Sequence, residues 1–434
     1  MPQASIVVVG AGLAGLRACE GLRSRGFEGR ITLVGDEPHL PYDRPPLSKQ
    51  FLAGEWELDR VMLSSPEKVA GLGLDLRIGP EQRAVSLDLG VRRLVLASGE
   101  AVGFDGLVLA TGSAARKLPD LNRLPGVHVL RTLDDAMALR EVLVRPGARL
   151  ALAGAGFIGL EVAATARRLG AEVTVVEPLE VPLGRVLGPV LGRACEAMHR
   201  EEGVSFHLGT VVESVRAGSD GAAQPSGTGE LACRLSNGQV VEVDALLVGI
   251  GAAPSVGFLE GSGLQAGPDG IVCDRFLTAG PGVVVAGDVA RWPAPGWRVP
   301  AGDEETAPTV RVEHRTNAAE QGEVAAASLL AYLGLPTAAT APTAATDLAP
   351  QAHELPYVWS DQYGVKIQAL GLPRNDDEVV IVEGNPSERR FLALYGRGGR
   401  LQAAVGFSRP RHVMMVRPLL ERGATLSEAR ALFS

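Results

Sequence analysis

The chain has 434 residues, is 46% hydrophobic and carries a formal net charge of −8 at pH 7. This length exceeds a single core and predicts two to four domains, and the negative charge argues against a nucleic-acid partner. The cysteines stand alone and the histidines are scattered, so no metal site is expected. We find no signal peptide and no apolar run that could span a membrane, and therefore expect a cytoplasmic protein with no membrane partner.

The first motif lies at the start of the chain. Residues 5–26, SIVVVGAGLAGLRACEGLRSRG, predict a buried strand, a turn and a helix, and the turn matches G-x-G-x-x-G at Gly10, Gly12 and Gly15. The first glycine permits the tight turn, the second lets the backbone approach a pyrophosphate, and the third allows close helix–strand packing. Asp36, which closes the next strand, would accept hydrogen bonds from a ribose. The pattern predicts a dinucleotide site.

The same pattern occurs a second time. Residues 149–177 place Gly154, Gly156 and Gly159 after a strand, and the following strand ends in Glu177. An acid at this position favours a free 2′-hydroxyl and repels a 2′-phosphate, so the second site is predicted to prefer NAD over NADP.

Three further apolar strands end in small residues, where a backbone can pass close to a cofactor. They are 106-GLVLATGS-113 with Gly112, 245-ALLVGIGAAP-254 with Gly251, and 282-GVVVAGDVA-290 with Asp288. A carboxylate at the end of such a strand, here Asp288, can hold a polyol hydroxyl such as one on the ribityl chain of a flavin.

Taken together, these motifs resemble the flavoproteins that bind two dinucleotides, and within them the FAD-dependent NAD(P)H:ferredoxin reductases of bacterial oxygenase systems. The resemblance implies an α/β fold with two Rossmann-like domains in a glutathione-reductase-like arrangement, FAD in the first and NAD in the second. It also implies a small C-terminal α+β domain. The segments that carry the resemblance are 35-GDEPHLPYDRPPLSK-49, 131-RTLDDA-136, 154-GAGFIGLE-161, 287-GDVA-290, 311-RVEHRTNAAEQG-322 and 356-PYVWSDQYGVKIQALG-371.

The predicted domains follow this order along the chain. They are an FAD-binding domain in two parts at 1–116 and 250–333, an NAD-binding domain at 117–249, a low-complexity linker at 334–350 and a C-terminal domain at 351–434. A polar hairpin extension is expected at 217–229.

The C-terminal domain is expected to contain four strands and a closing helix. The strands are predicted at 354–361, 378–384, 390–396 and 400–407, and the helix at 410–423. In the family this domain packs over the flavin and helps to form either a dimer or the acceptor surface. A homodimer is therefore one possible assembly that the resemblance implies. Trp359 is the candidate for an aromatic lid.

The loop 40-LPYDRPPLSK-49 contains no cysteine, whereas disulfide-reducing relatives carry a redox cysteine pair in the corresponding region. The resemblance places Lys49 near the flavin N5/O4 edge, where a cation would stabilise negative charge on reduced flavin. It makes Glu161 the partner of Lys49, and these two are the predicted catalytic residues.

The resemblance also assigns residues to the cofactors. The candidate cofactor-binding residues are Gly10, Gly12, Ala14, Gly15, Asp36, Arg44, Lys49, Ala84, Gly112, Arg131, Gly154, Gly156, Ile158, Gly159, Glu177, Gly251, Asp288 and Arg315. Arg44 and Arg131 match contacts to the flavin pyrophosphate or adenine side, and Ala84 a backbone contact to the adenine. At Arg315 the sequence departs from relatives that often have tryptophan, which affects the polarity expected around the flavin.

The resemblance implies that NADH passes hydride to FAD and that single electrons then go to a [2Fe–2S] ferredoxin serving an oxygenase. The alternatives are a flavin NADH oxidase, a quinone or monodehydroascorbate-type reductase, and a redox-sensing interaction protein similar to apoptosis-inducing factor. A coenzyme A disulfide reductase is disfavoured, because the loop at 40–49 has no cysteine.

Overall fold

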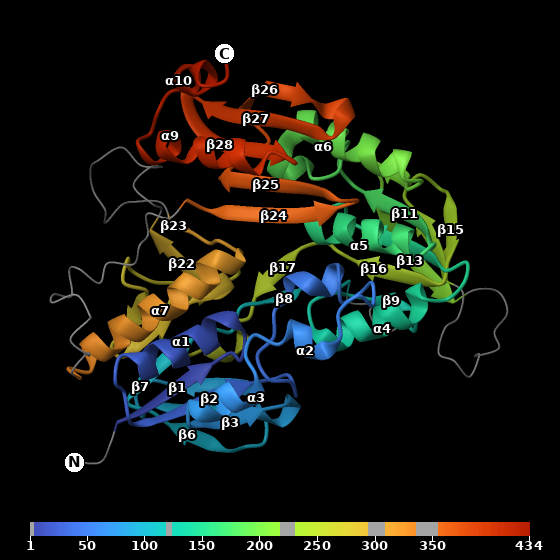
Figure 1. Cartoon of the computed structure of the whole chain (residues 1–434). Helices are drawn as coiled ribbons and strands as arrows, with labels where there is room; N and C mark the ends of the chain where they lie inside the picture. The colour runs from blue at the N-terminus through green and yellow to red at the C-terminus, as the bar shows by residue number, and fades with distance from the viewer. Residues whose placement is uncertain (1–3, 119–123, 218–230, 294–308, 336–354) are drawn as a thin grey trace. The chain divides into compact units, whose positions relative to one another are not determined.

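The computed structural model describes residues 4–118, 124–217, 231–293, 309–335 and 355–434. The chain forms two compact units, each assembled from segments that are far apart in the sequence (Figure 1). Unit 1 consists of Met1–Asp43, Val61–Ala114 and Ala253–Pro356, and unit 2 of Arg44–Arg60, Ala115–Ala252 and Tyr357–Ser434. The hairpin extension predicted at 217–229 and the linker at 334–350 lie almost wholly outside the described residues. The predicted domain boundaries stay predictions.

Unit 1 is built on a six-stranded sheet in the order β20-β21-β7-β1-β2-β3. Its strands are β1 (Ser5–Val9), β2 (Arg30–Gly35), β3 (Leu74–Ile78), β7 (Gly106–Leu109), β20 (Thr278–Gly280) and β21 (Val283–Val285). β1 pairs in parallel with β2 on one side and β7 on the other. All four residues of β7 and the last four of β1 are buried, which explains their unbroken apolar sequences, since central parallel strands are covered on both faces.

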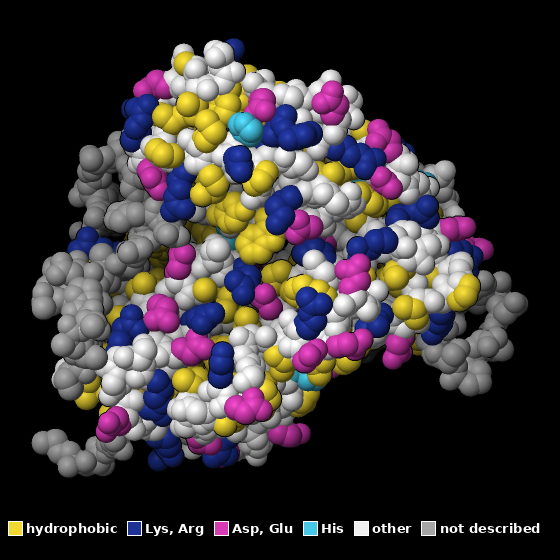
Figure 2. All heavy atoms as spheres, in the orientation of Figure 1, with side chains coloured by type: hydrophobic (Ala, Val, Ile, Leu, Met, Phe, Trp, Pro, Cys, Tyr) yellow, Lys and Arg dark blue, Asp and Glu magenta, His cyan; other side chains and the backbone are white. Residues whose placement is uncertain are grey.

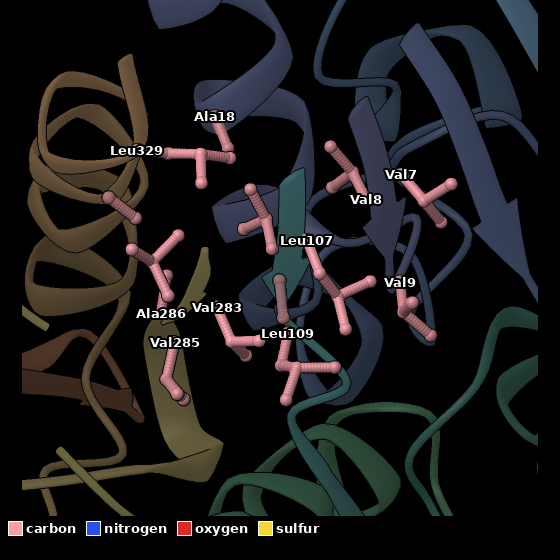
Figure 3. Close-up of a cluster of buried hydrophobic side chains, with 14 of the residues drawn as sticks. Val7, Val8, Val9, Ala18, Leu107, Leu109, Val283, Val285, Ala286 and Leu329 are labelled. Atoms are coloured by element: carbon pink, nitrogen blue, oxygen red, sulfur yellow. The ribbon is translucent and has the colours of Figure 1, made fainter. Parts of the chain in front are cut away.

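The core of unit 1 gathers side chains from the centre of this sheet and from two helices, α1 (Leu13–Ser24) and α7 (Arg315–Tyr332). Figure 3 shows valines and leucines of β1, β7 and β21 in this buried cluster, together with Ala18 of α1 and Leu329 of α7.

Unit 2 contains a five-stranded sheet in the order β12-β11-β10-β16-β9, in which every pair of neighbouring strands is parallel. Its strands are β9 (Val127–His128), β10 (Arg149–Ala153), β11 (Glu172–Glu177), β12 (Ser205–Leu208) and β16 (Ala245–Val248), and its helices are α4 (Leu133–Leu143), α5 (Phe157–Arg168) and α6 (Gly184–Glu201). β10 lies at the centre and pairs in parallel with β11 and β16. Both glycine motifs therefore follow a strand that pairs in parallel on both sides, and the predicted order of strand, turn and helix is confirmed.

The other helices and strands that precede residue 311 are short. They are α2 (Leu58–Val61), α3 (Pro66–Gly71), β4 (Ala84–Asp88), β5 (Arg93–Leu96), β6 (Ala101–Gly103), β8 (Ser113–Ala115), β13 (Val212–Ala217), β14 (Leu231–Leu235), β15 (Val240–Val243), β17 (Ala252–Pro254), β18 (Ala266–Gly267), β19 (Gly270–Val272), β22 (Ala290–Pro293) and β23 (Thr309–Val310).

The C-terminal part of unit 2 is an antiparallel sheet in the order β24-β25-β28-β27-β26, followed by three short helices. The strands are β24 (Tyr357–Gln362), β25 (Val365–Gly371), β26 (Glu378–Asn385), β27 (Arg390–Arg397) and β28 (Arg400–Phe407), and the helices are α8 (Pro410–Met415), α9 (Arg417–Glu421) and α10 (Leu426–Ala431). The expected α+β composition is confirmed.

Two predictions for this domain were wrong. β25 was not among the four predicted strands, although it pairs with β24 and β28 along almost its whole length. The single helix predicted at 410–423 is two helices that meet at Val416. Pro418 explains the break, because it has no N–H to bond the preceding turn and is tolerated only in the first turn of a new helix.

No helix among the described ranges is both long and apolar enough to cross a membrane. On the face drawn in Figure 2, basic and acidic side chains are interspersed over the surface of the described residues.

The packing of α1 against α7 yields a stability prediction. A Cβ at Gly322 of α7 would lie 2.5 Å from the carbonyl oxygen of Ala14 and 2.7 Å from Cβ of Arg17. Because backbone atoms of α1 must then move, Gly322→Ala should lower the free energy of unfolding by about 1–3 kcal/mol. Chemical denaturation of the two proteins measures this change.

Gly71 is the matched control, since a Cβ there meets no atom within 4 Å and the residue ends helix α3. Gly71→Ala should be neutral or stabilising by up to about 1 kcal/mol. Equal stability of the two variants would contradict the close approach of α1 and α7.

Candidate active site

The first glycine loop connects β1 to α1. Gly10 has φ of 115°, and a Cβ there would lie 2.1 Å from the carbonyl oxygen of Ala110. A Cβ at Gly15 would lie 1.9 Å from the carbonyl oxygen of Gly10. A Cβ at Gly12, in contrast, meets nothing within 4 Å, and no side chain caps the helix that starts there. The loop thus leaves free space beside an uncapped helix N-terminus, which suits a phosphate.

The second loop repeats this geometry between β10 and α5. Gly154 has φ of 106° and would place a Cβ 2.5 Å from the carbonyl oxygen of Gly249. A Cβ at Gly159 would lie 2.6 Å from the carbonyl oxygen of Gly154, whereas one at Gly156 meets nothing within 4 Å. This helix also begins without a side-chain cap. Both loops therefore fit the pyrophosphate of a dinucleotide.

The acids that follow the loops differ in their surroundings. Glu177, at the end of β11, is buried and accepts N–H bonds from Ala155 (2.7 Å) and Leu179 (3.0 Å). The carboxylate is thereby fixed beside the second glycine loop. Asp36 follows β2 and is exposed. Each acid stands at its predicted place at the carboxyl end of a strand, and contact with a ribose stays a prediction for both.

Lys49 and Glu161 form a buried ion pair. Lys49 follows the 3₁₀ turn η1 (Pro45–Ser48), and Glu161 lies on α5. The Nζ–Oε2 distance is 2.7 Å, and the side chains are only 11% and 7% exposed. Thr165 of α5 donates to the carbonyl oxygen of Ser48 at 2.8 Å, so the turn is anchored to the helix that carries the acid.

Further donors surround the carboxylate of Glu161. Ser48 donates its hydroxyl to Oε2, and Ser360 of β24 donates to Oε1 at 2.7 Å. A buried charge is tolerated when it is paired and when its remaining lone pairs are hydrogen-bonded, and both conditions hold here. The sequence reasoning missed these two serines, although Ser360 occupies an inward position of β24, where an apolar residue is usual.

Arg44 and Arg131 are connected directly. Arg44 donates from its guanidinium to the carbonyl oxygen of Arg131. The N–H groups of Arg131 and Thr132 bond one carboxylate oxygen of Asp135, at 2.9 and 2.8 Å, and Thr132 caps α4. The capping box at the start of α4 therefore holds the backbone that Arg44 contacts.

Arg315, the departure from the family pattern, forms an ion pair with Asp43, with Nε 2.7 Å from Oδ1. The Arg315 side chain is 34% exposed, so the pair is partly open to solvent. Near Asp288, Gly287 donates its N–H to Gln321 at 2.8 Å and Arg311 donates to the Asp288 carbonyl oxygen at 3.0 Å. The strand end that carries Asp288 is thus held by α7 and by a basic side chain.

The structure divides the predicted cofactor residues between the units. Unit 1 contains Gly10, Gly12, Ala14, Gly15, Asp36, Ala84, Gly112, Asp288 and Arg315. Unit 2 contains Arg44, Lys49, Arg131, Gly154, Gly156, Ile158, Gly159, Glu177 and Gly251. Within unit 1, Ala14 is buried and Ala84 is half-buried at the start of β4. Within unit 2, Ile158 is 48% exposed. Trp359 stacks on Tyr357 with ring centroids 5.9 Å apart, and its role as a lid stays a prediction.

All four cysteines are free and buried. Burial raises the pKa of Cys19 and of Cys195 to about 12, and that of Cys233 to about 11. The thiols are therefore protonated at neutral pH and are poor nucleophiles, which makes them unsuited to thiol–disulfide exchange.

The sequence matches two known families. Residues 4–322 match the family described as pyridine nucleotide-disulphide oxidoreductase, and residues 357–432 match the one described as reductase C-terminal.

Full-length relatives are also found. The chain is 35% identical to rhodocoxin reductase of Rhodococcus erythropolis over 98% of this chain and 92% of the relative. It is 32% identical to putidaredoxin reductase of Pseudomonas putida, over 94% and 89% of the two chains. The crystal structure of the covalent putidaredoxin reductase–putidaredoxin complex matches with a TM-score of 0.83 and 30% identity, covering 98% of this chain and 94% of that one. The chain therefore belongs to the pyridine nucleotide-disulphide oxidoreductase family.

Proposed function

We propose that this protein is an NADH-dependent flavoprotein reductase that delivers single electrons to a [2Fe–2S] ferredoxin, which serves an oxygenase. The observation that carries the proposal is the environment of Lys49. In a family named for disulfide chemistry, the loop at 40–49 holds no thiol and instead buries an ammonium group against Glu161. Other full-length relatives are named as ferredoxin reductases, which supports a ferredoxin as acceptor over dioxygen or a small quinone.

The two glycine loops would hold the dinucleotides, FAD at Gly10–Gly15 and NADH at Gly154–Gly159. A bound flavin supplies the conversion of a two-electron hydride transfer into one-electron transfers. The chain itself contributes binding, orientation and charge, because no protein nucleophile is needed for electron transfer. Lys49 would stabilise negative charge at the flavin edge, and Glu161 would hold the ammonium group in place.

The proposed acceptor is tested by measuring reduction of cytochrome c by NADH, with and without added bacterial [2Fe–2S] ferredoxins, putidaredoxin among them. We expect rapid reduction that depends on ferredoxin. If NADH is oxidised as fast with a small quinone alone as with a ferredoxin, the quinone reductase alternative is favoured.

We also propose that the protein works in the cytoplasm, where NADH is supplied.

The role of Lys49 is tested by Lys49→Met. This variant should retain FAD but reduce it more slowly with NADH, by up to about 10²–10³-fold if a preorganised electrostatic contact is lost. Glu161→Gln should slow the same step. The double variant should lose less than the sum of the two single effects, because paired residues are coupled. Stopped-flow absorbance of the oxidised flavin measures each rate.

Lys366→Met is the control, since Lys366 lies in the same unit, its side chain is half exposed, and its ammonium group forms a long ion pair with Asp361, at 3.7 Å. Its flavin reduction rate should equal that of the unaltered protein. Normal reduction in Lys49→Met, with FAD bound, would assign the loop a structural role only.

Glu177 is expected to select NADH over NADPH. Glu177→Ala should narrow this preference, because repulsion of the 2′-phosphate is removed, an effect of about 1–3 kcal/mol. The same change deletes the bonds to Ala155 and Leu179, so binding of both nucleotides should also weaken. The ratio of kcat/KM for the two nucleotides separates the two effects.

Glu172→Ala serves as the control for charge, since Glu172 is exposed at the opposite end of the same strand, β11. Its NADH to NADPH ratio should be unchanged. A preference of the unaltered protein for NADPH would overturn the assigned role of Glu177.

A further inference from the structure

The hydrogen bond from Ser360 to Glu161 is one end of a longer chain of polar side chains. Ser360 accepts a bond from Nε2 of Gln362 at 2.9 Å, and Oε1 of Gln362 lies 2.9 Å from Nε2 of His199. The hydroxyl of Tyr363 lies 3.1 Å from Nδ1 of His199. The chain thus runs from β24 through the C-terminal part of α6 (Gly184–Glu201) and returns to Tyr363 just after β24.

Three of these side chains are buried, and Tyr363 is partly buried. Ser360 and His199 are 0% exposed and Gln362 is 1% exposed, so each hydrogen bond forms in a medium of low polarity. A buried polar group without a partner costs free energy, and a fully satisfied network holds its members in one arrangement.

The positions of the protons follow from the chemistry of each group. An amide nitrogen can only donate, so Ser360 accepts from Gln362 and its own proton points to Glu161. The amide oxygen of Gln362 can only accept, so Nε2 of His199 carries the ring proton. Nδ1 of the neutral ring then accepts from Tyr363. Every donor along the chain therefore points toward the carboxylate of Glu161, and aligned hydrogen bonds of this kind polarise one another.

The ionisation states are consistent with this arrangement. Burial lowers the pKa of His199 to about 4, with Arg389 adding to the decrease and the Gln362 bond and Glu202 opposing it. The ring is therefore neutral at physiological pH. Burial also raises the pKa of the Tyr363 phenol, which keeps its proton.

We propose that Ser360 is a positioning residue for the Lys49–Glu161 pair. The hydrogen bonds through Gln362, His199 and Tyr363 strengthen the bond that Ser360 donates to the carboxylate. Strand β24 of the C-terminal domain thereby sets where the negative charge of Glu161 lies and hence where the ammonium group of Lys49 is held. The inference rests on the proposed function, in which this pair acts during flavin reduction.

The test measures flavin reduction by NADH in the absence of ferredoxin. Ser360→Ala should slow reduction at saturating NADH by about tenfold, the loss expected for one hydrogen bond to a charged group. The NADH concentration that gives half the maximal rate should change less than about twofold, because Ser360 acts through Glu161 and contacts no nucleotide in this proposal. Ser360→Thr keeps the hydroxyl on a strand-compatible side chain and should recover most of the rate.

Coupling to Glu161 distinguishes positioning from simple packing. In the Glu161→Gln background, Ser360→Ala should change the rate by less than about twofold, because the carboxylate it positions is gone. Tyr395→Phe is the matched control, since it also deletes a buried hydroxyl of the C-terminal sheet, one that donates to the carbonyl oxygen of Leu187 at 2.8 Å. It should leave flavin reduction unchanged in both backgrounds.

Tyr363→Phe keeps the test decisive if Ser360→Ala fails to fold, because Tyr363 is only partly buried and stands at the far end of the chain. It should slow reduction about two- to threefold, and only when Glu161 is present. Slow reduction in Glu161→Gln but normal rates in the Ser360 and Tyr363 variants would overturn this inference alone. Normal reduction in Glu161→Gln would overturn the proposed role of the pair as well.

Discussion

The buried ion pair between Lys49 and Glu161 is the interaction on which the arrangement of unit 2 depends, because its lost hydration must be replaced by hydrogen bonds. Two opposite charges with side chains 11% and 7% exposed lose most of their hydration, and their attraction offsets this loss only when further hydrogen bonds complete the site. Ser48 and Ser360 provide those bonds to the carboxylate. Because one serine precedes Lys49 and the other lies on β24, the pair connects the proline-rich turn, the helix of the second glycine loop and the C-terminal sheet.

A second constraint explains why the two nucleotide motifs look alike. In each, a glycine with positive φ passes within contact of a neighbouring backbone carbonyl, and a second glycine lets the helix approach the loop. The central glycine of each motif faces free space beside an uncapped helix N-terminus. Both units therefore meet the same need, which is a tight backbone turn that leaves space for a phosphate at a helix N-terminus. Separately, the loop at 40–49 has no redox thiol, and the electrons must therefore pass to an external acceptor.

Local signals account for the predictions that succeeded, whereas the strand β25 was missed because it depends on non-local contacts. Strand, glycine turn and helix form one contiguous stretch around Gly10 and another around Gly154, so their pattern is readable directly. The break of the predicted helix at Val416 follows from Pro418, a local signal that the prediction overlooked. The missed strand β25 shows the limit of local patterns. β25 owes its structure to pairing with β24 and β28, and sequence periodicity alone does not reveal the partners of a strand.

The sequence by itself determined the two strand–glycine turn–helix units and the acids at their strand ends, because each depends on a short motif with strict backbone needs. It placed Lys49 and Glu161 in one site only through the family resemblance. Only the tertiary structure decided how the charge of Glu161 is held. Ser360, which bonds Glu161, and His199, which bonds Gln362, lie far from Glu161 in the sequence, and no local sequence pattern predicts either hydrogen bond. Burial in a shared core brought them together and made their hydrogen bonds obligatory.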